Sequence, residues 1–236
     1  MKLLEVNQVS KRFGGLTANQ DVSFGVDEGQ VVGLIGPNGA GKTTMFNCVA
    51  GFFAPSAGSI VLDGHNIAGL PPEACARFGV ARTFQIARTF TSMTACENVM
   101  TAAMMREHKV SRARSVAMEW LRFARLERFA DRPAASLTIS EQRRLAVVRA
   151  LATEPRILLM DEVMAGLNPS EVREAVEVVL KIRDRGIACL IVEHVLEGIM
   201  PIADKIVVLD RGVKIAEGTP QEVSSDPVVI TAYLGD

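Results

Sequence analysis

The stretch VVGLIGPNGAGKTT, residues 31–44, decides the fold. It opens with a continuous apolar run, which is typical of a strand buried on both faces of a parallel sheet. Residues 36–43 then fit the pattern GxxxxGK(S/T), and residues 44–50 form a plausible helix. A strand, a glycine-rich loop and a helix in this order predict a phosphate-binding loop at the edge of an α/β sheet.

Glycines in such a loop permit backbone angles that turn successive N–H groups inward, and the helix N-terminus adds a favourable dipole for anions. We expect Lys42 to reach the outer phosphates of a nucleotide and the Thr43 hydroxyl to bind Mg²⁺. The residues expected to contact the nucleotide here are Gly36, Asn38, Gly39, Ala40, Gly41, Lys42, Thr43 and Thr44.

Two acidic residues follow a second apolar run, residues 157–160. A carboxylate at the carboxyl end of such a strand faces the ligand crevice of an open α/β sheet. Asp161 therefore fits a Mg²⁺ ligand, and Glu162 is a candidate to orient the attacking water in phosphoryl transfer. Alone, the pair could be a salt bridge or a helix cap, but the phosphate loop favours the catalytic interpretation.

Further apolar runs at 188–192 and 206–209 alternate with helical patterns such as 170–183, which predicts a doubly wound α/β core. Residues 3–9 and 20–26 mix alternating and apolar stretches around a Gly-Gly turn and predict an opening antiparallel layer.

The chain is expected to form a single domain over residues 1–236. Residues 94–135 are rich in Arg and Met and contain no convincing strand, so we expect an inserted helical lobe, placed at about 88–153. A short helical tail is expected at about 219–236.

Composition excludes several classes of protein. With a formal net charge of −1, the chain lacks the broad basic character of a nucleic-acid-binding protein. It contains no apolar stretch of about 18 residues and no secretory signal pattern at its start, so we expect a cytoplasmic protein that meets membranes through partners. Its four cysteines have no CxxC spacing, which argues against zinc and disulfide frameworks.

With these motifs placed, the whole chain resembles the nucleotide-binding domain of ABC transporters, and the resemblance implies ATP as the nucleotide. It implies that Phe13, in KRFG, stacks on adenine, where Tyr is commoner, and that Gln85, in RTFQ, touches Mg²⁺ and water. His194, in IVEH, matches the histidine that contacts the γ-phosphate. Residues 165–169, AGLNP, resemble the D-loop, which crosses the dimer interface in the family.

Within the family, the chain looks most like the ATPases of branched-chain amino acid importers. That likeness implies transmembrane permease subunits, a second ABC ATPase subunit, a substrate-binding protein that acts indirectly, and a place at the cytoplasmic face of the membrane. Residues 85–91 are expected to line a groove for a permease helix. The likeness is carried by Arg82-Thr83-Phe84-Gln85, Phe46-Asn47-Cys48, Ala165-Gly166-Leu167-Asn168-Pro169 and Ala232-Tyr233-Leu234-Gly235.

The sequence departs from the family at its LSGGQ signature, which here reads Leu137-Thr138-Ile139-Ser140-Glu141. Thr138 and Ser140 remain candidates to contact the nucleotide held by the opposite subunit. Ile139 and Ser140 replace two glycines, however, and side chains there obstruct close approach to the γ-phosphate. We therefore expect a heterodimer with one efficient and one slower site, and a homodimer is the alternative that the sequence leaves open. Val163, where proline is common, is a smaller departure.

Four alternative interpretations compete with this one. A GTPase would carry an NKxD sequence, which is absent. An ABC ATPase that remodels nucleic acid or ribosomes usually has two fused domains or a long coiled insertion. An exporter subunit, such as that of lipopolysaccharide export, is a near relative of the importer ATPases. A regulatory nucleotide-binding subunit is suggested by the altered signature, although Glu162 and His194 are retained.

Overall fold

The computed structural model describes residues 2–83 and 89–234. Its first sheet is antiparallel, with strand order β2-β1-β4-β5. The strands are β1 (Lys2–Phe13), β2 (Leu16–Asp27), β4 (Ala57–Leu62) and β5 (His65–Asn66). The predicted antiparallel layer is therefore confirmed, and both opening strands extend beyond their expected ends up to the Gly14-Gly15 turn.

The second sheet has the order β10-β9-β3-β8-β7-β6 and is parallel except at β10. Its strands are β3 (Val31–Ile35), β6 (Val80–Arg82), β7 (Ile157–Asp161), β8 (Ala188–Val192), β9 (Lys205–Asp210) and β10 (Val213–Gly218). Every residue of β3, β7 and β8 is buried, which explains why these strands are apolar apart from Asp161 at the end of β7. The predicted α/β core with a mainly parallel sheet is confirmed.

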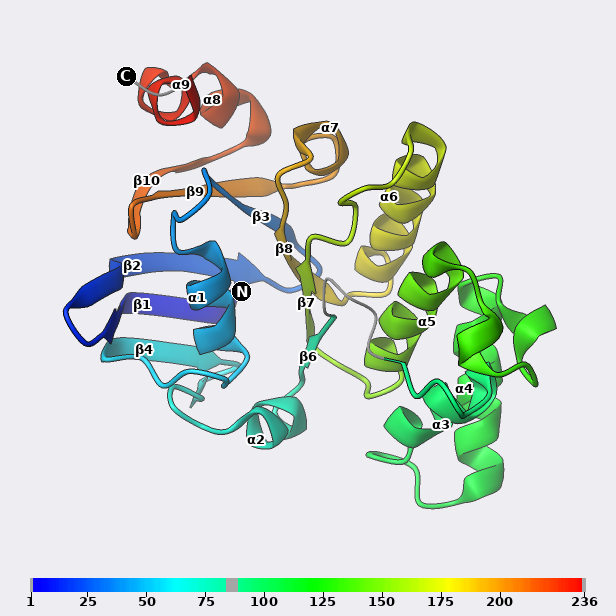
Figure 1. The fold of residues 1–236 in the computed structure, drawn as a ribbon. Coiled ribbons are helices and arrows are strands. Elements are labelled where there is room, and N and C mark those ends of the chain that lie inside the picture. Colours follow the sequence, from blue (N-terminus) through cyan, green and yellow to red (C-terminus); the bar gives the residue numbers. More distant parts are fainter. Residues whose placement is uncertain (1, 84–88, 235–236) are drawn as a thin grey trace.

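Helices cover this sheet and form a separate group beside it (Figure 1). The group contains α3, α4 and α5, which lie between β6 and β7 in the chain and pack on one another. The helices are α1 (Lys42–Val49), α2 (Pro72–Arg77), α3 (Ala95–Ala103), α4 (Val110–Phe123), α5 (Ile139–Leu151), α6 (Pro169–Arg183), α7 (Leu196–Ile199), α8 (Pro220–Ser225) and α9 (Pro227–Leu234).

Local sequence sets where these helices begin. Asn168 caps α6 by accepting hydrogen bonds from the backbone of Ser170 and Glu171, and Pro169 occupies the first turn, where no N–H is needed. Helix α1 begins at Lys42, two residues earlier than predicted, because Gly41 already adopts a left-handed conformation that ends the loop. The helix therefore includes both Lys42 and Thr43.

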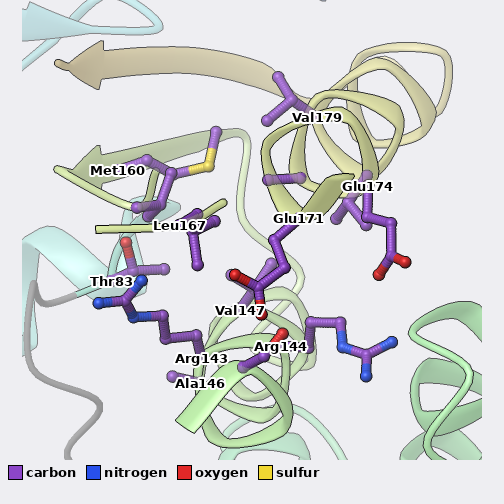
Figure 2. Close-up of a pocket in the computed structure, with 14 residues that line it drawn as sticks. Thr83, Arg143, Arg144, Ala146, Val147, Met160, Leu167, Glu171, Glu174 and Val179 are labelled. Atoms are coloured by element: carbon purple, nitrogen blue, oxygen red, sulfur yellow. The ribbon is translucent and has the colours of Figure 1, made fainter. Parts of the chain in front are cut away.

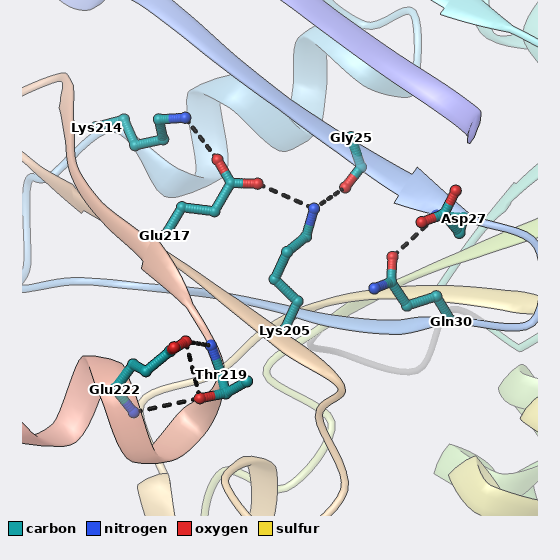
Figure 3. Close-up of polar contacts among 8 residues, drawn as sticks. All are labelled: Gly25, Asp27, Gln30, Lys205, Lys214, Glu217, Thr219 and Glu222. Atoms are coloured by element: carbon teal, nitrogen blue, oxygen red, sulfur yellow. Dashed lines mark hydrogen bonds and ion pairs between the residues drawn. The ribbon is translucent and has the colours of Figure 1, made fainter. Parts of the chain in front are cut away.

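A lysine joins the two sheets. Lys205 at the start of β9 donates from Nζ to the Gly25 carbonyl of β2 at 2.6 Å, and it pairs with Glu217 of β10 at 2.9 Å (Figure 3). Glu217 also pairs with Lys214 of the same strand. The contact fixes the antiparallel layer against the parallel sheet. No helix among the described residues is long and apolar enough to cross a membrane.

Candidate nucleotide-binding site

The loop between β3 and α1 depends on three glycines. Gly36, Gly39 and Gly41 have φ angles of 145°, 81° and 93°, a region that disfavours other residues. A Cβ atom on Gly36 would lie 2.0 Å from the Leu209 carbonyl oxygen, and one on Gly41 would lie 2.5 Å from the Ala18 carbonyl oxygen. Strain and crowding therefore both require glycine at the first and last of these positions.

The turn between β9 and β10 holds the loop in place. The backbone N–H of Gly212 donates to the Ala40 carbonyl at 3.1 Å, and the Gly212 carbonyl accepts from Gln20 at 2.8 Å. Asn19 is fully buried and donates from its side-chain amide to the Gly41 carbonyl at 3.3 Å. The loop is thus anchored by both sheets.

Lys42 lies at the centre of the loop and is only 8% exposed. Its Nζ donates to the carbonyls of Gly36 at 2.7 Å and Pro37 at 2.9 Å. Burial lowers the pKa of Lys42, while the nearby carboxylates of Glu162 and Asp161 act in the opposite direction. A cation is therefore positioned at the loop with carboxylates within electrostatic reach.

The loop lines an open cavity of about 530 Å³. Glu162 faces the same cavity from the end of β7, so the structure brings this carboxylate together with the loop. The sequence did not indicate the remaining lining residues, which come from the β1–β2 hairpin and the β9–β10 turn. The full lining consists of Leu16, Thr17, Ala18, Asn38, Gly39, Ala40, Gly41, Lys42, Thr43, Thr44, Glu162 and Arg211.

Asp161 is 9% exposed, and its Oδ2 accepts a hydrogen bond from Arg82 at 2.8 Å. Arg82 also donates to Asn47 Oδ1 at 2.5 Å, and its guanidinium lies over the rings of Phe46 and Phe52. In the sequence, Arg82 stands out only through the subfamily likeness of Arg82-Thr83-Phe84-Gln85. Its contact with Asp161 could not be read from the chain, because the two residues lie 79 positions apart.

Glu162 and His194 also lie close together. Parallel pairing of Asp161 with Val192 aligns the ends of β7 and β8, and the residues that follow these strands are therefore neighbours. His194 Nδ1 is 3.6 Å from Glu162 Oε1. Glu162 itself has a φ of 49°, which is uncommon for a residue with a side chain.

Other predicted site residues lie outside the cavity lining. Phe13 is at the tip of the β1–β2 hairpin, where its ring packs edge-on against Phe53 at 5.2 Å, while Leu16 across the hairpin lines the cavity. Thr138 caps α5 in a reciprocal pair of hydrogen bonds with Glu141. Gln85 falls outside the described residues.

Ser140 faces a different and smaller cavity of about 60 Å³ between α5 and α6 (Figure 2). Arg143 of α5 lines the same cavity and donates to the Ala165 carbonyl at 2.9 Å. The beginning of α5 is therefore tied to the D-loop-like residues 165–169, and it does not belong to the lining of the phosphate-loop cavity.

Comparisons with known proteins agree with this geometry. The family model described as ABC transporter matches residues 19–165, and a model described as branched-chain amino acid ATP-binding cassette transporter matches residues 213–236. The chain is 44% identical to the high-affinity branched-chain amino acid transport ATP-binding protein BraF of Pseudomonas aeruginosa, over 99% of this chain and 98% of that protein. It is 40% identical to LivG of Escherichia coli K12, which has the same description, with the same coverage.

Among solved structures, the ADP conformation of MJ1267, an ATP-binding cassette of an ABC transporter, matches with a TM-score of 0.91 and 30% identity over all of both chains. The match of the family model to most of the chain and the full-length likeness to transport ATP-binding proteins lead to one assignment. The chain belongs to the ABC transporter family, as one of its ATP-binding and ATP-hydrolysing subunits.

Proposed function

We propose that this chain is the ATP-driven motor of an importer for branched-chain or related amino acids and amides, held at the cytoplasmic face of the membrane by permease subunits. The observation that carries the proposal is the single cavity in which the glycine loop, Lys42 and Glu162 meet. The full-length likeness to BraF and LivG, and the match at residues 213–236, support the substrate class.

In this proposal, the loop N–H groups and Lys42 bind the phosphates of ATP, and Phe13 lies against adenine. Glu162 accepts a hydrogen bond from the attacking water and orients it for in-line attack. His194, 3.6 Å from Glu162, contacts the γ-phosphate. Positioning and charge stabilisation are the main requirements of phosphoryl transfer, and these groups supply both.

The residues present also fit Mg²⁺. The described residues contain no cluster of three or more His, Cys, Asp or Glu side chains suited to hold a metal ion. Mg²⁺ bound with a nucleotide needs no such cluster, because phosphates and water complete its shell around one or two protein oxygens. The Thr43 hydroxyl and Asp161 would hold the ion, with Gln85 as a further ligand, and the ion would neutralise charge that develops on the phosphates.

The proposed partners account for features outside the cavity. In the proposed head-to-tail dimer, Thr138 and Ser140 contact the nucleotide of a second ATPase subunit. Two solved structures of the ABC transporter cassette MJ0796, with 25% identity and a TM-score of 0.82, are dimeric. An open groove of about 410 Å³, lined by Phe52, Phe90 and Met105 among others, lies between α2, β6 and the helical lobe. We propose that this groove receives a permease segment.

Export remains the second candidate direction, since the chain is 34% identical to the lipopolysaccharide export system ATP-binding protein LptB of Escherichia coli K12. Reconstituted vesicles distinguish the two directions. Uptake of labelled branched-chain amino acid, driven by ATP on the side that carries this chain, supports import. Loss of substrate from the side that carries this chain and ATP, into the opposite compartment, supports export.

The first test measures steady-state ATPase activity of the purified chain, alone and with its permease and ATPase partners, beside Glu162→Gln. The variant keeps the size of the side chain but cannot act as a carboxylate. We expect activity mainly in the complex, and a loss of about 100-fold or more in the variant, with ATP still bound. Tight ATP binding without turnover in any complex would identify a regulatory subunit instead.

A further inference from the structure

Two successive residues at the end of β8 hold the segment that carries Glu162. The Val192 carbonyl accepts a hydrogen bond from the backbone N–H of Glu162 at 2.9 Å. The Glu193 carboxylate oxygen Oε1 accepts one from the backbone N–H of Met164 at 2.7 Å. Met164, two residues after Glu162, is thus held by the side chain of Glu193.

Glu193 is fully buried, although the neighbouring His194 is 54% exposed on its side chain. Burial raises the pKa of Glu193. Its second oxygen, Oε2, is buried without a hydrogen-bond partner among the residues that the structure describes. A polar group in such a place is costly, and an apolar residue of similar size would avoid the cost. The backbone of Val195 and His194 also interacts with this carboxyl group, but the 2.7 Å bond to Met164 is the contact that reaches the segment carrying Glu162.

The position of Met164 matters because Glu162 has a strained backbone. A φ of 49° is unfavourable for a residue with a side chain, and it persists only where the surroundings of the residue fix it. Met164 is itself fully buried. It packs so closely on Gly198 that a Cβ atom added to Gly198 would lie 2.4 Å from the Met164 sulfur. The segment is therefore held at two points: Val192 binds the backbone N–H of Glu162, and Glu193 binds the backbone N–H of Met164.

We propose that Glu193 is a positioning residue: through its bond to Met164 it fixes the backbone of residues 162–164, and so places the Glu162 carboxylate relative to His194 and the phosphate loop. Its role lies in the acceptor oxygen, and it touches neither nucleotide nor water. This inference rests on the proposed role of Glu162.

The role predicts a separation between binding and turnover. The groups that bind phosphates lie on the loop after β3, and they do not depend on Met164. A carboxylate displaced by about 1 Å, in contrast, costs about 100-fold in rate. Loss of the Glu193 bond should therefore lower kcat and leave nucleotide affinity nearly unchanged.

The experiment compares three variants in the transporter complex. Glu193→Met removes the acceptor and keeps the length of the side chain. Glu193→Gln keeps an acceptor oxygen in the same place. Glu193→Asp withdraws the carboxyl group by one methylene and serves as the test if the Met variant does not fold. For each, kcat is expressed per nucleotide-binding site, and affinity is measured with ADP.

We expect Gln to retain kcat within about twofold, and Met and Asp to lower it by about 10- to 100-fold with affinity changed less than about twofold. Wild-type kcat in the Met or Asp variant, equal damage in the Gln and Met variants, or a parallel loss of affinity would each overturn the proposal. Glu162→Gln separates the two ideas: if that variant keeps wild-type turnover, the proposed role of Glu162 fails, and the role of Glu193 fails with it.

Discussion

Three ionisable residues around the phosphate loop, Lys42, Asp161 and Glu193, are almost completely buried. Each must compensate for lost hydration. Lys42 does so through two loop carbonyls, and Asp161 through Arg82. Glu193 is compensated less completely. Its Oε1 accepts a hydrogen bond from a backbone N–H, but burial outweighs this bond and raises the pKa of Glu193. Among the described residues around the loop, Glu193 is therefore an acid whose charged form burial disfavours.

This shift predicts how stability depends on pH. A carboxyl group with a raised folded-state pKa binds its proton more tightly in the folded protein than in the unfolded chain. Its stabilising contribution is therefore complete below the pKa of the group in the unfolded chain, near 4.5. The contribution is lost as pH rises through the pKa of the group in the folded protein. Glu193→Gln removes the titrating group. We expect the free energy of unfolding of the variant, relative to wild type, to increase with pH across this window.

Urea denaturation at a series of pH values from about 5 upward measures the difference. Glu119, an exposed residue with its carboxylate 3.4 Å from Arg185, provides the control as Glu119→Gln, because an exposed ion pair contributes little to stability. A difference between Glu193→Gln and wild type that stays constant with pH would contradict the prediction.

Sequence identified some of these residues and missed others for a physical reason. Lys42, Thr43, Asp161 and Glu162 were identified because their roles depend on the order of strand, loop and helix, which is local in the chain. Glu193 could not be identified, because its bond joins a side chain to the backbone 29 residues away. The roles assigned to the identified residues stay predictions.

At the scale of elements, continuous apolar runs predicted β3, β7 and β8 correctly, since strands buried on both faces leave no room for polar residues. Two-residue β5 and three-residue β6 are too short to produce such a pattern. The sequence also could not predict how the two sheets pack on each other. Their packing depends on contacts such as that of Lys205 with Gly25, which lies 180 residues earlier in the chain.

The contact between the sheets leads to a stability prediction. Lys205→Met keeps most of the side chain but removes the bonds to the Gly25 carbonyl and to Glu217. Hydrogen bonds from a charged donor contribute about 1.5–3 kcal/mol, less where water reaches them, so we expect a loss of about 1–2 kcal/mol in the free energy of unfolding.

Lys214→Met is the matched control, because Lys214 pairs with the same carboxylate within β10 and is not bonded to β2. Its loss should cost less than about 1 kcal/mol. Chemical denaturation of both variants measures the two values, and equal destabilisation would show that the pairing with Glu217, rather than the link between sheets, carries the effect.

For the molecule as a whole, the phosphate-loop cavity and the beginning of α5 are separate, and the cavity lining includes no residue of α5. This separation is what the proposed head-to-tail dimer requires, since each complete site then combines one chain's loop with the other's α5. Ile139 stands at the first position of α5 with 74% of its surface exposed. In such a dimer, it would face the partner's nucleotide.

In a complex with a second ATPase subunit, we therefore expect Ile139 and Ser140 to limit turnover at the site that uses α5 of this chain. Glu162→Gln in this chain silences the site built on its own phosphate loop, so that the remaining turnover reports the site that uses its α5. Adding Ile139→Gly and Ser140→Gly lets backbone N–H groups approach the partner's γ-phosphate. One preorganised donor is worth about 100- to 1,000-fold in rate, and we expect a rise of at least about tenfold.

Glycine in the first turn of α5 also lowers helix stability, by up to about 1 kcal/mol per residue. Thr138 and Glu141, which cap the helix reciprocally, stay in place to limit this loss. Thermal unfolding of the variant checks that the complex is intact at the assay temperature. An intact complex whose remaining turnover does not rise would show that the two side chains do not limit the second site, and the asymmetry of the proposed dimer would have to be abandoned.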